Sequence, residues 1–133
     1  MAFSRRAWEA LIDDCLHRLP LEACGLLGAS GGVVRGVFPA ENVRHSPASY
    51  EIAAREQIRL RKEISLAGYT LWGIYHSHPG GVPWPSQVDI IQAYYQDLYY
   101  VIVSCRPAKP TVGVFRIVNG QVSACPVRIL PDA

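Results

Sequence analysis

The segment Tyr99–Cys105 constrains the fold of this chain more than any other, because it is apolar at nearly every position. A strand with one solvated face alternates apolar and polar residues, whereas a strand covered on both faces is apolar almost throughout. We therefore expect this segment to lie at the centre of a sheet, with further layers packed against both of its faces.

Amphipathic helices are the candidates for those layers. Apolar residues at helical spacing predict a helix over residues 4–19, with Ser4 as its N-cap. A second apolar stripe predicts a helix over residues 53–67, which Gly68 would end. A third helix is expected over residues 86–97.

The remaining segments are predicted to be strands separated by turns. Asn119-Gly120 is the strongest hairpin signal in the chain, here between residues 111–118 and 122–129. The other predicted strands are 22–28, 33–38, a brief 50–52, and 71–78. Because helices and strands are interspersed, we predict an α/β fold (mixed α+β) with a central mixed β-sheet flanked by helices. No linker divides residues 1–133, so a single domain is expected.

The composition excludes several classes of function. Of 133 residues, 50% are hydrophobic and 18% are charged, so the chain can bury a core and is not disordered. Thirteen basic and eleven acidic residues leave a net charge of +2. That balance is unsuited to electrostatic binding of nucleic acid or an anionic membrane. The apolar runs are also too short to span a bilayer.

The cysteines and the first residues indicate a cytoplasmic protein. Cys15, Cys24, Cys105 and Cys125 form no Cys-x-x-Cys pair, which disfavours a thiolate zinc site. The N-terminal segment lacks the uninterrupted apolar stretch of a signal peptide. We therefore expect reduced thiols, each acting as a small apolar side chain.

The pair His76 and His78 is the first candidate for chemistry. Both lie on the predicted strand 71–78, and residues two apart on a strand point to the same face. Asp89 follows after a loop rich in proline and glycine, and a carboxylate is a natural third ligand. Three protein ligands leave one tetrahedral position for water, which is the arrangement of a catalytic zinc.

Each of these residues also has an explanation without a metal. A lone His-x-His pair on a strand is more often a chance or core pair than a site. Ser86 and Asp89 match a helix capping box, and Glu22 alone would be a solvated carboxylate. The capping and metal roles of Asp89 are compatible, because a capped first turn would hold its carboxylate in place.

Taken together, the motifs closely resemble the JAMM (MPN+) metalloprotease family. Its signature is a glutamate, then His-Ser/Thr-His-Pro, then a serine followed three positions later by an aspartate. This chain has Glu22 within Glu-x-Cys-Gly-Leu-Leu-Gly, then residues 76–79, then Ser86-x-x-Asp89. The resemblance covers essentially the whole chain and implies a JAMM/MPN fold, which is similar to the cytidine-deaminase-like architecture.

The resemblance also implies a role for each motif residue. His76, His78 and Asp89 would bind Zn²⁺, with water as the fourth ligand. Glu22 would be the general base that takes a proton from that water and passes it to the leaving amine. Ser86 would donate a hydrogen bond to the oxyanion. Together these roles describe zinc-dependent hydrolysis of a peptide or isopeptide bond.

The partner implied by the resemblance is a small ubiquitin-like or sulfur-carrier protein, cleaved after a C-terminal Gly-Gly. We expect the loop Pro79–Pro85, with Trp84, to wall a narrow groove beside a free strand edge. The globular body of the carrier is expected to dock near the second helix, at Arg55, Arg59 and Arg61. The sequence does not set the oligomeric state and leaves a homodimer open.

Two alternatives come from other classes. A non-enzymatic MPN-type scaffold would keep the fold and lose the ligands, yet every ligand is present. A zinc-dependent nucleobase deaminase would need His-x-Glu and Pro-Cys-x-x-Cys, and neither occurs. Cys24 shares strand parity with Glu22 and could border the site, although we prefer a structural role for it.

Overall fold

The computed structural model describes residues 1–106 and 109–131, and its strands join in one sheet. The strands are β1 (Ala2–Ser4), β2 (Cys24–Ser30), β3 (Val33–Ala40), β4 (Thr70–His78), β5 (Tyr99–Ser104), β6 (Thr111–Val118), β7 (Gln121–Ala124) and β8 (Arg128–Leu130). Their order across the sheet is β7-β6-β5-β4-β2-β3-β1-β8. The pairs β4–β5, β1–β3 and β1–β8 are parallel and the others antiparallel, which confirms the predicted mixed sheet.

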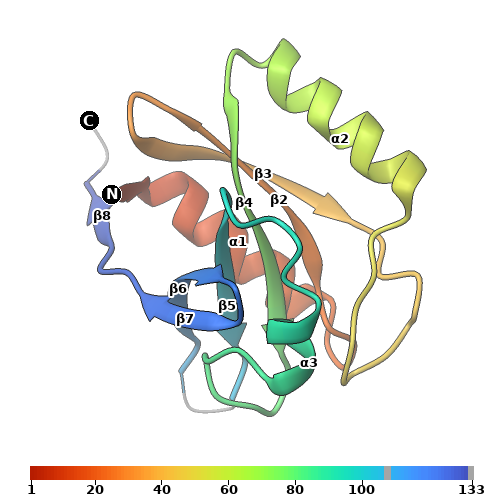
Figure 1. Cartoon of the computed structure of the whole chain (residues 1–133). Coiled ribbons are helices and arrows are strands. Elements are labelled where there is room, and N and C mark those ends of the chain that lie inside the picture. Colours follow the sequence, from red (N-terminus) through yellow and green to blue (C-terminus); the bar gives the residue numbers. More distant parts are fainter. Residues whose placement is uncertain (107–108, 132–133) are drawn as a thin grey trace.

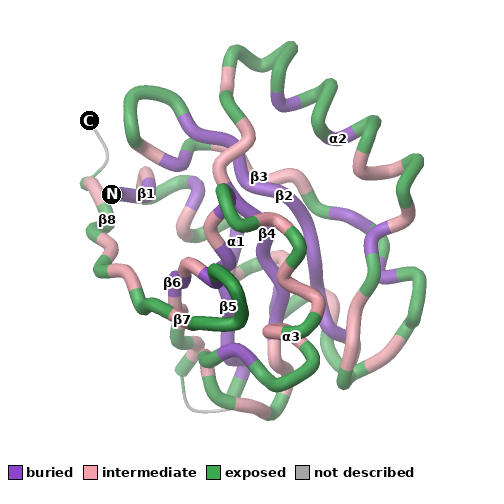
Figure 2. The backbone as a smooth tube through the Cα atoms, viewed as in Figure 1, coloured by how far each residue is buried: buried purple, intermediate pink, exposed green. Residues whose placement is uncertain are grey.

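Helices α1 (Arg5–His17) and α2 (Ala54–Leu66) cover opposite faces of this sheet, as Figure 1 shows. Leu11 of α1 packs in one apolar cluster with Leu27 of β2, whereas Leu60 of α2 packs in a second cluster with Leu26. Neighbouring residues of β2 therefore pack against helices on opposite faces of the sheet. The tube in Figure 2 is buried along most of β2, β4 and β5. The predicted central position of β5 is confirmed.

Local signals explain where both long helices begin and end. The Ser4 hydroxyl accepts a hydrogen bond from the N–H of Ala7 at 3.1 Å, which is the expected N-cap of α1. After α2, Gly68 has a φ of 84°, a left-handed conformation that glycine adopts without strain. In the part of the chain that the structure describes, no helix combines the length and the apolar composition needed to cross a membrane.

The C-terminal region differs from the predicted hairpin. The turn is as expected, because Asn119 and Gly120 both have positive φ, 52° and 77°. However, the returning strand β7 ends at Ala124. After the short connection 125–127, β8 pairs in parallel with β1. Sequence pattern did not reveal this switch, because β8 pairs with residues 2–4, at the other end of the chain.

Two further elements were predicted wrongly. Residues 50–52 form no strand, because the N–H of Glu51 bonds to the side chain of Asn42 and not to the sheet. The third helix, α3 (Gln87–Ile91), ends well before residue 97. After α3, the N–H of Tyr95 donates to the hydroxyl of Tyr100 on β5 at 3.0 Å. This N–H therefore makes a tertiary hydrogen bond and not the bond that a further helical turn would need.

Candidate metal centre and active site

The register between β2 and β4 brings Glu22 to the two histidines. Cys24 lies opposite His76 in this antiparallel pair. The pairing continues past the end of β2, since Ser77 donates its N–H to the Ala23 carbonyl at 3.0 Å. Two residues before Cys24, Glu22 therefore falls across from His78 and faces the same side of the sheet.

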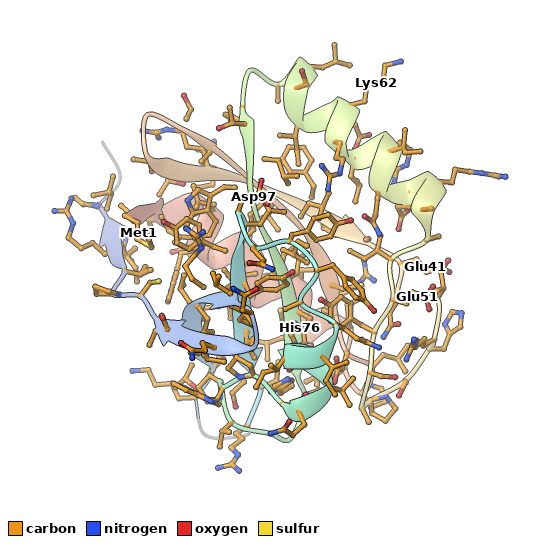
Figure 3. All side chains as sticks on the ribbon, in the orientation of Figure 1. Met1, Glu41, Glu51, Lys62, His76 and Asp97 are labelled. Atoms are coloured by element: carbon orange, nitrogen blue, oxygen red, sulfur yellow. The ribbon has the colours of Figure 1, made fainter. Side chains whose placement is uncertain are left out.

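Three candidate ligands converge on one point. His76 Nε2 and His78 Nε2 are 3.2 Å apart. Asp89 reaches both of them, with Oδ1 at 3.1 Å from His76 Nε2 and Oδ2 at 3.0 Å from His78 Nε2. The candidate ligand atoms of the three residues all lie within 4.8 Å of one another. In Figure 3, His76 on β4 lies beside α3, the helix that carries Asp89.

Neighbouring groups hold these side chains in place. The Val82 carbonyl can only accept, so His78 donates its Nδ1–H at 2.8 Å, which leaves Nε2 to face the cluster. Asp89 is fixed by a capping box, in which its Oδ2 accepts the Ser86 N–H at 2.9 Å and its own N–H bonds to Ser86 Oγ at 3.1 Å. The His76 ring stacks on Tyr50 with centroids 4.5 Å apart.

Burial and hydrogen bonding set the ionisation of the cluster. Burial lowers the pKa of His76 and favours its neutral form. Burial would also lower the pKa of His78, but the hydrogen bonds with Asp89 and the Val82 carbonyl outweigh it and raise that pKa. Burial would raise the pKa of Asp89, yet hydrogen bonds from both imidazoles hold it well below its usual range. An anionic carboxylate thus faces two imidazole nitrogens.

The donor set fits a divalent cation. Imidazole nitrogen and carboxylate oxygen are the ligands that Zn²⁺ takes at about 2.0–2.2 Å, and three protein ligands characterise catalytic zinc sites. A histidine ligand is usually oriented by a hydrogen bond from the ring nitrogen that faces away from the metal, as Nδ1 of His78 makes to the Val82 carbonyl. His76, His78 and Asp89 could therefore hold a metal without rearrangement of the backbone.

Glu22 is the unusual carboxylate of the site. Its side chain is only 5% exposed, and Oε1 is buried without a hydrogen-bond partner among the described residues. Burial raises its pKa to about 7; the charge of Asp89 also raises it, and that of His78 opposes them. A buried carboxylate left without a partner requires a functional explanation. A general base with a pKa near neutrality supplies one.

The other predicted residues take less central places. Ser86 is exposed and caps α3, and because its oxygen accepts a bond, its hydroxyl hydrogen stays free to donate. Trp84 is half exposed and packs edge-on against Phe115, with centroids 4.9 Å apart. Cys24 is fully buried, with its thiol directed at the Ala40 carbonyl, in agreement with a structural role.

The structure also corrects one expectation about the surroundings of the site. β4 pairs with β2 on one side and β5 on the other, so it offers no free strand edge beside the histidines. A hollow of about 400 Å³ lies instead next to Tyr50, floored by Leu26, Ile74 and Tyr100. Sequence reasoning missed Tyr50, because nothing in the pattern of its loop connects it to His76.

Comparison with known proteins assigns the chain to a family. Residues 4–118 match the family model described as prokaryotic homologs of the JAB domain. The chain belongs to this family. Its membership confirms the resemblance to the JAMM (MPN+) proteins.

Relatives of this JAB-family chain carry peptidase names. It is 34% identical over 125 residues to the CysO-cysteine peptidase of Mycobacterium tuberculosis, which covers 92% of this chain and 86% of that protein. It is also 34% identical over 88 residues to the desampylase of Haloferax volcanii, covering 64% of this chain and 63% of the relative. The prediction of a metallopeptidase-type enzyme is therefore confirmed.

Solved structures share its fold. The solution structure of DSY2949 from Desulfitobacterium hafniense is 30% identical, with a TM-score of 0.87, covering 99% of this chain and 94% of that one. AF2198, a JAB1/MPN domain protein from Archaeoglobus fulgidus, has a TM-score of 0.67 at 16% identity and covers 98% and 99% of the two chains. The predicted JAMM/MPN fold class is thus confirmed for this JAB-family chain.

Proposed function

We propose that this chain is a single-domain zinc peptidase that cleaves the amide bond after the C-terminal Gly-Gly of a small ubiquitin-like sulfur carrier. The observation that carries the proposal is the convergence of His76, His78 and Asp89 beside Glu22, whose Oε1 is buried with no hydrogen-bond partner among the described residues. A scaffold would have no use for this costly arrangement, because a buried unpaired carboxylate destabilises the fold.

His76, His78 and Asp89 would hold the metal. When bound, Zn²⁺ supplies a Lewis acid that polarises a carbonyl and makes water a stronger acid. The chain prepares for it by holding Asp89 as an anion and by directing the Nε2 atoms of both histidines to one point. The Val82 carbonyl and the Ser86 N–H keep the last two ligands from rotating.

Glu22 would move the proton. In the metal-free protein, burial raises its pKa to about 7, so both protonation forms are accessible near neutral pH. It can therefore accept a proton from the attacking water and donate one to the leaving amine, without a large energetic mismatch in either step. Ser86 would donate its free hydroxyl hydrogen to the oxyanion of the tetrahedral intermediate.

Family membership supports the substrate class. One relative is named for cleavage of CysO-cysteine and another is named a desampylase, so peptidases of this family act on conjugates of small proteins. Gly-Gly suits a tail that must pass close to a buried site, because it carries no side chains. We place this activity in the cytoplasm, in keeping with the four free cysteines.

The carrier body would dock over α2, although the charge there is smaller than the sequence suggests. Arg59 is paired with both Glu56 and Glu63 at 3.0 Å, so its charge is largely compensated. Arg61 lies over the Tyr95 ring, 5.4 Å from its centroid. Arg55 and Arg61 are thus the cations that we propose for contact with an acidic surface.

The proposal is tested with a β-grasp carrier that ends in Gly-Gly followed by cysteine or a short peptide. We expect mass spectrometry to show loss of the residues after Gly-Gly, with about one zinc per chain by elemental analysis. Glu22→Gln serves as the control that keeps the fold. An intact carrier together with cleavage of unrelated unfolded peptides would contradict the substrate class. Absence of zinc after reconstitution would contradict the metal site.

A further inference from the structure

Asn42, in the loop that follows β3, has a buried amide with an unusual set of partners. Its side chain is 4% exposed, and all its partners are backbone groups. Nδ2 donates to the carbonyls of Glu22 (3.1 Å), Ser49 (2.9 Å) and, more weakly, Ser46 (3.4 Å), and Oδ1 accepts from the N–H of Arg44 (3.1 Å) and Glu51 (3.2 Å). The amide thus uses both donors and its acceptor.

Two of these partners lie on either side of Tyr50. The carbonyl of Ser49 and the N–H of Glu51 are both bound to Asn42, so the backbone that presents the Tyr50 ring is fixed at both ends. That ring stacks on His76 with centroids 4.5 Å apart and an interplanar angle of 21°. Asn42, together with the Val43 N–H that donates to the Glu51 carbonyl at 3.0 Å, therefore fixes the backbone on both sides of this ring.

The two histidine rings are oriented by different contacts. Histidine ligands usually donate their second ring nitrogen to an acceptor that fixes the ring, as His78 does to Val82. Nδ1 of His76 is buried and has no hydrogen-bond partner among the described residues. In the described structure, contact with Tyr50 takes the orienting role that a hydrogen bond has in His78.

The remaining partner is the candidate base. The carbonyl of Glu22 accepts from Asn42, and its N–H donates to the carbonyl of Ser46 at 2.9 Å in the same loop. Both backbone groups of Glu22 are therefore attached to the segment that Asn42 organises. The same loop, organised by Asn42, therefore holds the backbone of both Glu22 and Tyr50.

We propose that Asn42 is a positioning residue, whose amide holds the Glu22 carboxylate and the Tyr50 ring in their places around His76. The inference rests on the proposed metal site. Its consequence is that loss of one amide remote from the reacting atoms disturbs two functions together. Zinc affinity falls through Tyr50 and His76, and proton transfer slows through Glu22.

The expected effect on zinc binding is tested by measuring zinc affinity in competition with a chelating dye. We expect Asn42→Ala and Tyr50→Ala each to weaken zinc binding about 10-fold, the lower range for outer-shell partners of metal ligands. Because Asn42 acts through Tyr50, the double variant should bind zinc no more weakly than Tyr50→Ala alone. Ser46→Ala, which removes only an exposed bond to the Ala48 N–H, is the matched control and should stay within about twofold.

The expected effect on Glu22 and proton transfer is tested by hydrogen exchange and by kinetics. In Asn42→Ala, the amides of Glu22 and Glu51 should exchange faster together. The kcat on a carrier with its Gly-Gly end linked to aminomethylcoumarin should fall about 10-fold or more, with KM little changed. If Asn42→Ala does not fold, Asn42→Ser replaces it, since a hydroxyl is too short to span the same partners.

Three outcomes would overturn the role of Asn42. These are unchanged zinc affinity in a folded Asn42 variant, losses that multiply in the double variant, or unchanged exchange at Glu22 and Glu51. A wild-type protein that binds zinc but leaves the carrier conjugate intact would instead contradict the proposed substrate. In that case zinc affinity and exchange still decide the inference.

Discussion

Replacing Glu22 with glutamine should slow turnover strongly and, at alkaline pH, make the protein more stable. The pKa of Glu22 is raised by burial from 4.5 to about 7. A carboxyl group with a raised pKa in the folded state contributes stability that is fully present below its unfolded pKa. That stability is lost as the pH rises through the folded value. Glutamine carries no charge at any pH, so Glu22→Gln removes a penalty that develops as the pH rises above 4.5 and is complete above about pH 7.

The size of the effect follows from the two pKa values. The difference between 4.5 and about 7 corresponds to about 3 kcal/mol, at 1.36 kcal/mol per unit. Water that reaches the mouth of the site screens part of this energy, so we expect a gain of about 1–2 kcal/mol. The gain should be present at pH 8.5 and absent at pH 4, where both forms of the residue are neutral.

Urea unfolding of the metal-free protein at these two pH values measures the gain. Glu41→Gln, which changes an exposed carboxylate, is the control and should shift stability little at either pH. In the zinc-loaded protein, the same Glu22 variant should retain zinc and lose about 10²–10⁴-fold in rate. A variant destabilised equally at both pH values would refute the assignment of burial as the cause. Loss of zinc would show that Glu22 is a ligand.

Further substitutions address the remaining roles. His76→Ala or His78→Ala should abolish zinc binding and turnover together, as measured by elemental analysis and a cleavage assay. Ser86→Ala should retain zinc and lose about 10²–10³-fold in kcat if the hydroxyl serves the oxyanion. If Ser86 only caps α3, the variant should lose about 1 kcal/mol of stability, with turnover per folded molecule unchanged. Leu60→Ala, at a fully buried position of α2, should lower the free energy of unfolding by about 2–5 kcal/mol in thermal or urea melts.

Much of the fold could be predicted because local signals and tertiary structure agree. The helix capped by Ser4, the strands β2 to β5 and the Asn119-Gly120 turn all follow from periodicity and turn chemistry. The failures have a common cause, namely contacts between residues distant in the chain. β8 exists because residues 2–4 offer a parallel neighbour, and α3 ends early because Tyr95 is held by Tyr100.

The same distinction applies to the candidate site. Strand parity alone places His76 and His78 on one face, and the capping pattern alone fixes Asp89 near the start of a helix. Glu22 could be linked to them only through the family resemblance, because its position depends on the β2–β4 register. Asn42 and Tyr50 gave no signal, since side-chain bonds to loop carbonyls leave no periodic trace in a sequence.

The short helix α3, which carries Asp89, has little apolar burial to stabilise it. None of its residues is buried, and its apolar side chains Val88 and Ile91 are 48% and 72% exposed. Besides the packing of Ile90 against the core, its order depends on the Ser86–Asp89 cap and on the contacts of Asp89 with the histidines. A metal bound there would contribute its binding energy to folding residues 79–91. Proteases are therefore expected to cut residues 79–91 faster in the metal-free protein than in the metal-loaded protein.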